Sequence, residues 1–181
     1  NLASSGGGMY NSSSSPILTD CAFTSNSASD GGGMVNNTST PTLTNCTFTS
    51  NSALAGGGMF NDGSSPTLTD CVFTGNSAES GGGAMFNYES RPVLADCVFS
   101  GNSTNGSGGG IKNEVSSSPS LENCTFTGNS AESGGAMFSE SDGSLPTFAA
   151  SVICGNSLEQ VAGPYSDLGG NCISEVCDTD G

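Results

Sequence analysis

The residues of this chain that could do chemistry are cysteines and carboxylates. Its 181 residues include eight Cys, 17 Asp and Glu, two Lys and Arg, and no His, so the formal net charge is −15. Without His the chain has no imidazole to act as a general base or as a metal ligand. Arg91 and Lys112 are the two cations. Two cations cannot neutralise the phosphates of a nucleic acid among so many carboxylates, so we expect no nucleic-acid partner.

The carboxylates do not form a pattern typical of polysaccharide cleavage. Hydrolysis of a glycoside needs two carboxylates that face each other across the sugar. Asp20, Asp70 and Asp96 instead recur at one place of a repeat where the backbone is expected to bend, and the other acids stand singly. Elimination from a uronate needs a cationic or phenolic base, and an acidic surface repels a polyanion. We therefore predict that the protein is not an enzyme.

Asp178 and Asp180 are the candidate metal ligands. The stretch Asp178-Thr-Asp-Gly181 resembles the start of an Asp-rich calcium loop, although the later ligand positions of such a loop do not follow. Calcium is thus the one cofactor that the sequence leaves as a candidate.

The eight cysteines fall into two groups. Five of them occupy one position of a repeat, namely Cys21, Cys46, Cys71, Cys97 and Cys124. Stacked in register, these side chains would point the same way, which favours free buried thiols over disulfides. The other three, Cys154, Cys172 and Cys177, form a C-terminal set in which one disulfide would fasten the end of the chain and indicate an oxidising, extracellular setting. Zinc held by these three thiolates is the competing interpretation, and it lacks a fourth ligand nearby.

A repeat covers most of the chain. Its unit reads P-x-L-x-x-C-x-F-x-x-N-S-A, a short linker, G-G-G-M-x-N and a Ser-rich turn, and its prolines are spaced 25 to 27 residues apart. A leucine-rich repeat has a similar length, but its return segment would have to form from Gly-Gly-Gly and Ser-Ser-Ser, which are poor in helices. A parallel β-helix needs only short strands and tight bends. We therefore predict an all-β chain, a β-solenoid of about six coils of 25–27 residues.

In such a solenoid each residue type lies about 4.8 Å from its copy in the next coil. The repeat then predicts inward ladders of Leu, Cys, Phe, Ala and Met, together with an Asn ladder. The Phe ladder consists of Phe23, Phe48, Phe73, Phe99 and Phe126, followed by Ile153, and the Asn ladder of Asn26, Asn51, Asn76, Asn102, Asn129 and Asn156. Stacked Asn side chains satisfy their own amides and nearby backbone groups, so we interpret the Asn ladder as structural. Asp or Asn at the bend between Leu and Cys predicts a left-handed backbone there.

The repeats extend over residues 1–157, and residues 158–181 are predicted to form a terminal turn and cap within a longer chain. The first residues align with the middle of a repeat, and an unpaired strand edge attracts another strand. We therefore expect self-association or continuation of the solenoid at this end, with end-to-end stacking into filaments as one form. No apolar run reaches the roughly 20 residues of a membrane-spanning helix.

The outward side chains suggest weaker possibilities. Thr-x-Thr pairs such as Thr47/Thr49 and Thr125/Thr127 could order water at an ice surface, but the array is interrupted, and β-propensity accounts for these Thr residues. The Ser-rich turns and the sequons at Asn36 and Asn102 are candidate glycosylation sites.

The tetrapeptides Phe-Thr-Gly-Asn (73–76 and 126–129) and Gly-Gly-Ala-Met (134–137) occur in order and resemble the repeat of polymorphic outer membrane proteins. The resemblance covers residues 1 to about 157, and the first three units depart from it with Gly-Gly-Gly-Met. It implies a right-handed parallel β-helix displayed at a cell surface, commonly for adhesion, and it carries over no catalytic residue. Together these observations predict an extracellular structural or adhesive solenoid, with glycans or a host surface as candidate partners. The alternative is a module that binds or cleaves carbohydrate.

Overall fold

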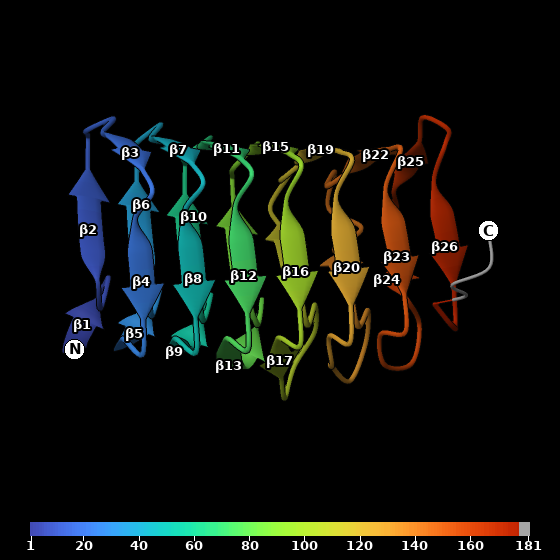
Figure 1. The fold of residues 1–181 in the computed structure, drawn as a ribbon, viewed down its shortest axis with the longest axis horizontal. Coiled ribbons are helices and arrows are strands. Elements are labelled where there is room, and N and C mark those ends of the chain that lie inside the picture. The colour runs from blue at the N-terminus through green and yellow to red at the C-terminus, as the bar shows by residue number, and fades with distance from the viewer. Residues whose placement is uncertain (178–181) are drawn as a thin grey trace.

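The computed structural model describes residues 1–177 as a parallel β-helix. Successive coils lie side by side along the long axis, so residue number increases from one end of the rod to the other (Figure 1). The expectation of an all-β solenoid of about six coils is thereby confirmed.

The strands form four parallel sheets, here called sheets A to D, and most coils give one strand to each sheet. Sheet A contains β1 (Leu2–Ser5), β5 (Ser27–Asp30), β9 (Ser52–Ala55), β13 (Ser77–Gly81) and β17 (Ser103–Thr104). Sheet B contains β2 (Met9–Ser12), β6 (Met34–Asn37), β10 (Met59–Asp62), β14 (Met85–Tyr88), β18 (Ile111–Glu114), β21 (Met137–Ser139) and β24 (Val161–Ala162). Sheet C contains β3 (Ile17–Thr19), β7 (Thr42–Thr44), β11 (Thr67–Thr69), β15 (Val93–Ala95), β19 (Ser120–Glu122), β22 (Thr147–Ala149) and β25 (Ser166–Asp167). Sheet D contains β4 (Ala22–Thr24), β8 (Thr47–Thr49), β12 (Val72–Thr74), β16 (Val98–Ser100), β20 (Thr125–Thr127), β23 (Val152–Cys154) and β26 (Cys172–Ser174).

The bend between sheets C and D is made by a single left-handed residue. Its φ lies between 51° and 55° at the five positions that the sequence singles out, Asp20, Asn45, Asp70, Asp96 and Asn123. Asn and Asp tolerate this conformation better than other side chains, which explains why these two types alternate at the position. Two of these bend residues also form a hydrogen bond with each other: the side-chain amide of Asn45 donates to the Asp20 carboxylate at 2.6 Å.

The glycine triplets bring the chain from sheet A back toward sheet B. The middle glycine of each triplet lies against the backbone of the next coil: a Cβ on Gly32 would collide with the carbonyl oxygens of Gly57 and Ser52. Any side chain there would push two coils apart. The triplet is therefore required by the close approach of one coil to the next.

The interior is filled by the predicted ladders. The rings of Phe23, Phe48, Phe73, Phe99 and Phe126 stack with centroids 4.6–4.9 Å apart and interplanar angles of 3–8°. Ile153 pairs with Phe126 at the end of the row. Burial of one such ring stabilises the fold by about 1.5–3 kcal/mol. Because Phe48, Phe73 and Phe99 each stack on rings in the coils on both sides, this stabilisation lies between coils rather than within one.

The last coil differs from those before it. Residues 158–174, within the segment that the sequence assigns to a terminal turn and cap, add β24, β25 and β26 to sheets B, C and D. Sheet A has its last strand at β17, and beyond it the pairing is reduced to bridges such as Ser103–Ser130. The solenoid thus loses one of its four walls before its C-terminal end.

Candidate ligand-binding groove

A groove with a volume of about 420 Å³ runs along sheet A across several coils. Its lining consists of small polar and apolar side chains: Ser27, Ala28, Ser52, Ala53, Leu54, Ser77, Ala78, Glu79, Ser103, Thr104, Asn105 and Ser130. The groove follows the axis of the solenoid, perpendicular to the strands that form it. A ligand in it would therefore cross one coil after another.

The lining residues form rows because the strands are in register. Ser52 pairs with Ser27, Ser77 with Ser52, and Ser103 with Ser77, which places one serine per coil along the groove. Ala53 and Ala78 pair in the same way one residue further on. Leu54, Glu79 and Asn105 follow the alanine position in successive coils and are exposed. The groove thus has a uniform row of hydroxyls on one side and a row of varied side chains on the other.

The serine hydroxyls of the groove are open to solvent. Among the described residues, the side chains of Ser27, Ser52, Ser77, Ser103 and Ser130 make no hydrogen bond within the protein, and all five are at least partly exposed. A hydroxyl both donates and accepts, so the row can pair with either kind of polar group. Glu79 is the charged residue of the lining, and no Lys or Arg is part of it. The groove therefore suits a polar ligand that carries no negative charge.

The Asn ladder lies inside the fold and does not face the groove. The backbone N–H and one side-chain N–H of each Asn donate to Oδ1 of the Asn in the next coil, at 2.8–3.1 Å. The amide of Asn76 also donates to the carbonyl oxygen of Phe48, and equivalent bonds follow in the later coils. Every amide is used in holding coils together, as expected of a structural role.

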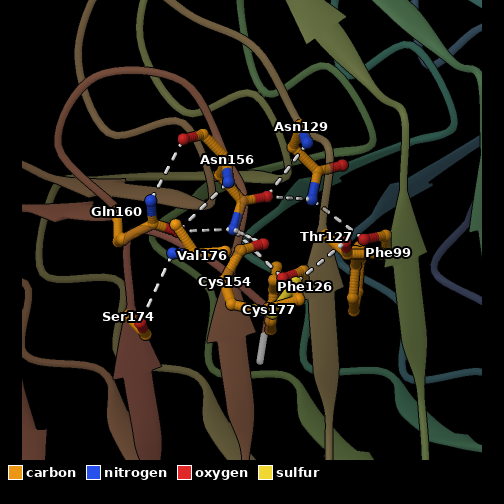
Figure 2. The surroundings of a disulfide bond; sticks show 10 residues. All are labelled: Phe99, Phe126, Thr127, Asn129, Cys154, Asn156, Gln160, Ser174, Val176 and Cys177. Carbon is orange, nitrogen blue, oxygen red and sulfur yellow. Dashed lines mark hydrogen bonds between the residues drawn. A yellow bond between two sulfur atoms is a disulfide. The ribbon is translucent and has the colours of Figure 1, made fainter. Parts of the chain in front are cut away.

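Gln160 ends the Asn ladder. Its Oε1 accepts from the side-chain amide of Asn156 at 2.8 Å and from the Asn156 backbone N–H at 3.2 Å, and its Nε2 donates to the Asn156 carbonyl oxygen (Figure 2). A side chain four residues along thus takes the place that the next Asn would occupy. The sequence offers no repeat signal for this residue because it occurs once.

The Cys ladder consists of free thiols. Cys46, Cys71, Cys97 and Cys124 are buried, and Cys21 is half-buried. Each buried thiol donates to backbone carbonyls, as Cys46 does to Thr44 at 3.4 Å. Burial raises the pKa of the Cys46 thiol. Hydrogen bonding among the neighbouring thiols raises the pKa of Cys97 and lowers the pKa of Cys71 and of Cys124. All four side chains are buried, whereas a nucleophile must be accessible to its substrate.

At the C-terminal end, Cys154 and Cys177 form a disulfide (Figure 2). Cys172 is free and exposed. Of the three cysteines that the sequence proposes for one bridge, these two are the pair that the structure joins. Asp178 and Asp180, the candidate calcium ligands, lie outside the described residues. Within residues 1–177 no group of three or more His, Cys, Asp or Glu side chains is placed to hold a metal ion.

Neither of the two cations is among the residues that line the groove. Lys112 forms an ion pair with Glu114 at 2.6 Å, and its ammonium lies 5.3 Å from the centre of the Phe86 ring. Arg91 is exposed and borders a separate shallow hollow with Glu89. The Lys112 side chain packs against Gly81 at the end of β13, the strand that gives Ser77, Ala78 and Glu79 to the groove.

Sequence reasoning missed the groove and two further ladders. A second row of buried amides runs from Asn11 through Asn36, Asn61, Asn87 and Asn113 to Ser139. A row of serine hydroxyls accepts from the backbone N–H one coil earlier, at Ser39, Ser64, Ser90, Ser117 and Ser144. The signals were the Asn two residues after four of the Met residues and after Ile111, and the recurring Ser of the turns. For the groove the signal was the Ser of the repeated Asn-Ser-Ala.

The two sequons fall on ladder residues. Asn36 and Asn102 are fully buried, and both amides take part in coil-to-coil hydrogen bonds. Neither amide can accept a glycan in the folded chain, so these candidate glycosylation sites are wrong.

The family model described as the right-handed β-helix region matches residues 1–173. No curated protein sequence matches the chain. Across residues 1–177, no helix has the length and apolar character needed to cross a membrane.

Proposed function

This chain belongs to the right-handed β-helix family, and we propose that it is a non-catalytic extracellular solenoid with a structural and adhesive role. The family includes both enzymes and non-enzymes, so membership alone does not decide whether the chain is an enzyme. The observation that carries this proposal is the use of the interior polar groups. Among the described residues every buried side-chain nitrogen and oxygen has a hydrogen-bond partner, and most of these partners lie one coil away. Such an interior serves to hold a long, regular surface in a fixed shape.

The makeup of the groove supports a non-catalytic function. Glycoside hydrolysis requires a second carboxylate across the sugar from the first, and Glu79 is the one carboxylate in the groove lining. The groove is nevertheless a surface that can bind, which supports adhesion. The resemblance to polymorphic outer membrane protein repeats also supports an adhesive role.

Adhesion and catalysis can be tested together. Beads coated with the folded chain should adhere to surfaces that carry cells or glycans, and beads coated with the heat-unfolded chain should not. Incubation of the chain with neutral and acidic polysaccharides should release neither reducing ends nor unsaturated products. Release of product would overturn the non-catalytic part, and equal adhesion of folded and unfolded chain would overturn the adhesive part.

Association through sheet edges is a further part of the proposal. The first strand of every sheet leaves one edge unpaired among the described residues, and every ladder is in register with the next coil. A second copy and a further coil of the same chain would fit this edge equally well. Sedimentation velocity at increasing concentration, with electron microscopy, should show rods that lengthen by whole copies. Rods of constant length at all concentrations would contradict end-to-end stacking.

The Cys154–Cys177 disulfide supports an extracellular location, because disulfides persist in oxidising compartments. Alkylation of the chain at harvest, followed by mass spectrometry, should find this pair protected and the ladder thiols free. Alkylated Cys154 and Cys177 in native material would contradict the location.

A further inference from the structure

We propose that the outward face of sheet B docks a basic, partly apolar segment of a partner protein, with a Lys or Arg side chain of that segment held by the Phe138 ring and the Glu140 carboxylate. This inference rests on the adhesive role proposed above and names its surface and its partner. Three observations support it: two rows of outward side chains, the position of Lys112 on them, and the charge of the face.

The outward side chains of sheet B form two rows. Inward and outward residues alternate along each strand, and the strands are in register, so outward residues align from coil to coil. The first row, here called the ring row, contains Tyr10, Val35, Phe60, Phe86, Lys112 and Phe138. The second, here called the polar row, lies two residues further along each strand and includes Asp62, Glu114 and Glu140.

Lys112 shows how this face binds an ammonium group. Its Nζ lies 5.3 Å from the centre of the Phe86 ring and 2.6 Å from the Glu114 carboxylate. The face of the ring attracts a cation, and the carboxylate supplies the counter-charge. The Lys112 side chain is only 13% exposed, so the chain itself occupies this ammonium site.

The same two groups recur in the next coil, where the chain supplies no ammonium. Phe138 is in register with Lys112, and Glu140 follows two residues later on the same face. Both side chains are half-buried. Within residues 1–177 the Phe138 ring has no stacked ring or ammonium beside it, and Glu140 forms no ion pair. The residue that follows Phe138 in the ring row is Ala162, which carries no charge.

The charge around Phe138 favours a basic partner. Burial and, after it, repulsion from the Glu114 carboxylate raise the pKa of Glu140. The single Lys of the chain, Lys112, is already paired with Glu114. A partner cation beside Glu140 would relieve the repulsion between the two carboxylates, whereas an acidic partner would add to it and would also approach a chain with a net charge of −15.

The aromatic side chains supply the apolar part of the surface. Tyr10 is 53% exposed, Tyr88 in the polar row is 37% exposed, and Phe60 is half-buried. Phe60 stacks on Phe86 with ring centroids 5.1 Å apart, which holds both rings in place. A partner that covers this surface must bring apolar side chains beside its basic ones. A wholly polar cation would use the ammonium site alone.

The experiment is isothermal titration of the whole chain with a short synthetic peptide in which Lys-Val-Lys-Ser repeats. One comparison peptide has Ser in place of every Lys, and another has Ser in place of every Val. The first peptide should bind, the peptide without Lys should not, and the peptide without Val should bind about fivefold more weakly. Phe138→Leu keeps an apolar side chain and removes the ring, and Glu140→Gln removes the charge. Each should weaken binding about fivefold.

Matched substitutions separate this site from general attraction to an acidic chain. Glu122→Gln removes the same charge from the outward face of sheet C and should change the affinity by less than about twofold, because exposed distant charges are screened. Lys112→Met frees the Phe86 ring and the Glu114 carboxylate for a second ammonium, so it should strengthen binding about fivefold. Arg91→Met removes the same charge from an exposed residue that forms no ion pair within residues 1–177, and it should strengthen binding less.

Three results would overturn the inference: no binding of the Lys-Val-Lys-Ser peptide, equal weakening by Glu140→Gln and Glu122→Gln, or equal strengthening by Lys112→Met and Arg91→Met. The predicted gain with Lys112→Met cannot result from a loss of fold, and all variants should keep the circular dichroism spectrum and melting profile. Beads coated with the double variant Phe138→Leu and Glu140→Gln separate the two proposals. Adhesion equal to that of the unaltered chain defeats the docking surface alone, whereas absence of adhesion by the unaltered chain defeats the proposed function.

Discussion

The inner coils and the last coil of this solenoid are stabilised by different interactions. Between Asn26 and Asn129 each coil has copies of its ladder residues on both sides, and the Phe rings stack in parallel. In the last coil Phe148 meets Tyr165 edge-on at 5.9 Å, Gln160 replaces a ladder Asn, and a disulfide joins Cys154 to Cys177. Repetition stabilises the inner coils, and single, non-repeated contacts stabilise the last one.

This difference follows from where stability resides in a repeat protein. Energy terms between neighbouring coils are nearly equal along the ladder, so an inner coil receives two of them and a terminal coil receives one. The Cys154–Cys177 bridge and the Gln160 cap add interactions at the place where one neighbour is missing. The comparison predicts that substitutions in the inner coils affect the whole rod, whereas those in the last coil act locally.

The largest effect is expected from Phe73→Ala. The ring is fully buried and stacks on Phe48 at 4.6 Å and on Phe99 at 4.9 Å, so its loss leaves a cavity between two coils. We expect the free energy of unfolding to fall by about 3–5 kcal/mol, measured by urea denaturation. Val161→Ala in the last coil should lower it by only about 1–2 kcal/mol. Equal losses would contradict the difference between the two regions.

Removal of a ladder amide should come next. Asn76→Ala deprives the Asn51 backbone and side-chain N–H groups and the Phe48 carbonyl oxygen of their partner inside the fold. Unpaired buried groups cost about 1–3 kcal/mol each, so we expect a loss of about 3 kcal/mol. Gln160→Ala should cost about 1 kcal/mol, because water can reach the end of the ladder. Hydrogen exchange should locate the first loss in the inner coils and the second near Asn156.

Reduction of the disulfide should lower the stability of the last coil only. The bridge closes a loop with a sequence separation of 23, for which the constraint on the unfolded chain contributes about 3–4 kcal/mol. The paired substitution of Cys154 and Cys177 by Ser should speed amide exchange across β24–β26 and leave β8–β20 unchanged. Faster exchange throughout the rod would mean that the last coil supports the inner ones.

Alkaline pH should destabilise the inner coils rather than the last coil. Burial raises the pKa of Cys46 in the folded chain, so this thiol loses its proton at a lower pH in the unfolded chain than in the folded one. The stabilisation is complete below the unfolded pKa of about 8.5 and is lost as the pH rises through the folded pKa. Between about pH 7 and pH 10 we expect Cys46 to account for a loss of roughly 1 kcal/mol, read from urea midpoints. Cys46→Ala should flatten this dependence, and an unchanged slope would contradict the assignment.

The comparison between regions also shows what sequence patterns can predict. The bends at Asp20 and Asn45, the Phe ladder and the Asn26-type ladder all follow from residues that recur at one spacing and from the period of two along a strand. The row that starts at Asn11 recurs just as regularly, but its inward direction depends on how the Gly triplet folds. Gln160 has no copies, so periodicity carries no information about it. The groove depends on how sheet A is set against the rest of the coil, which long-range packing decides.

The three hydrogen-bonded side-chain ladders share one direction. In both Asn rows and in the Ser row, the bonds from one row member to the next have the donor in the earlier coil and the acceptor in the later one. The dipoles of these bonds therefore add along each row, and each bond polarises the next. The second N–H of the amides in the first Asn row runs the other way, because it donates to a Phe carbonyl oxygen of the earlier coil. Each row is thus a chain of aligned hydrogen bonds, like one row of bonds in an α-helix, and the Gln160 oxygen accepts the last bond of the first row.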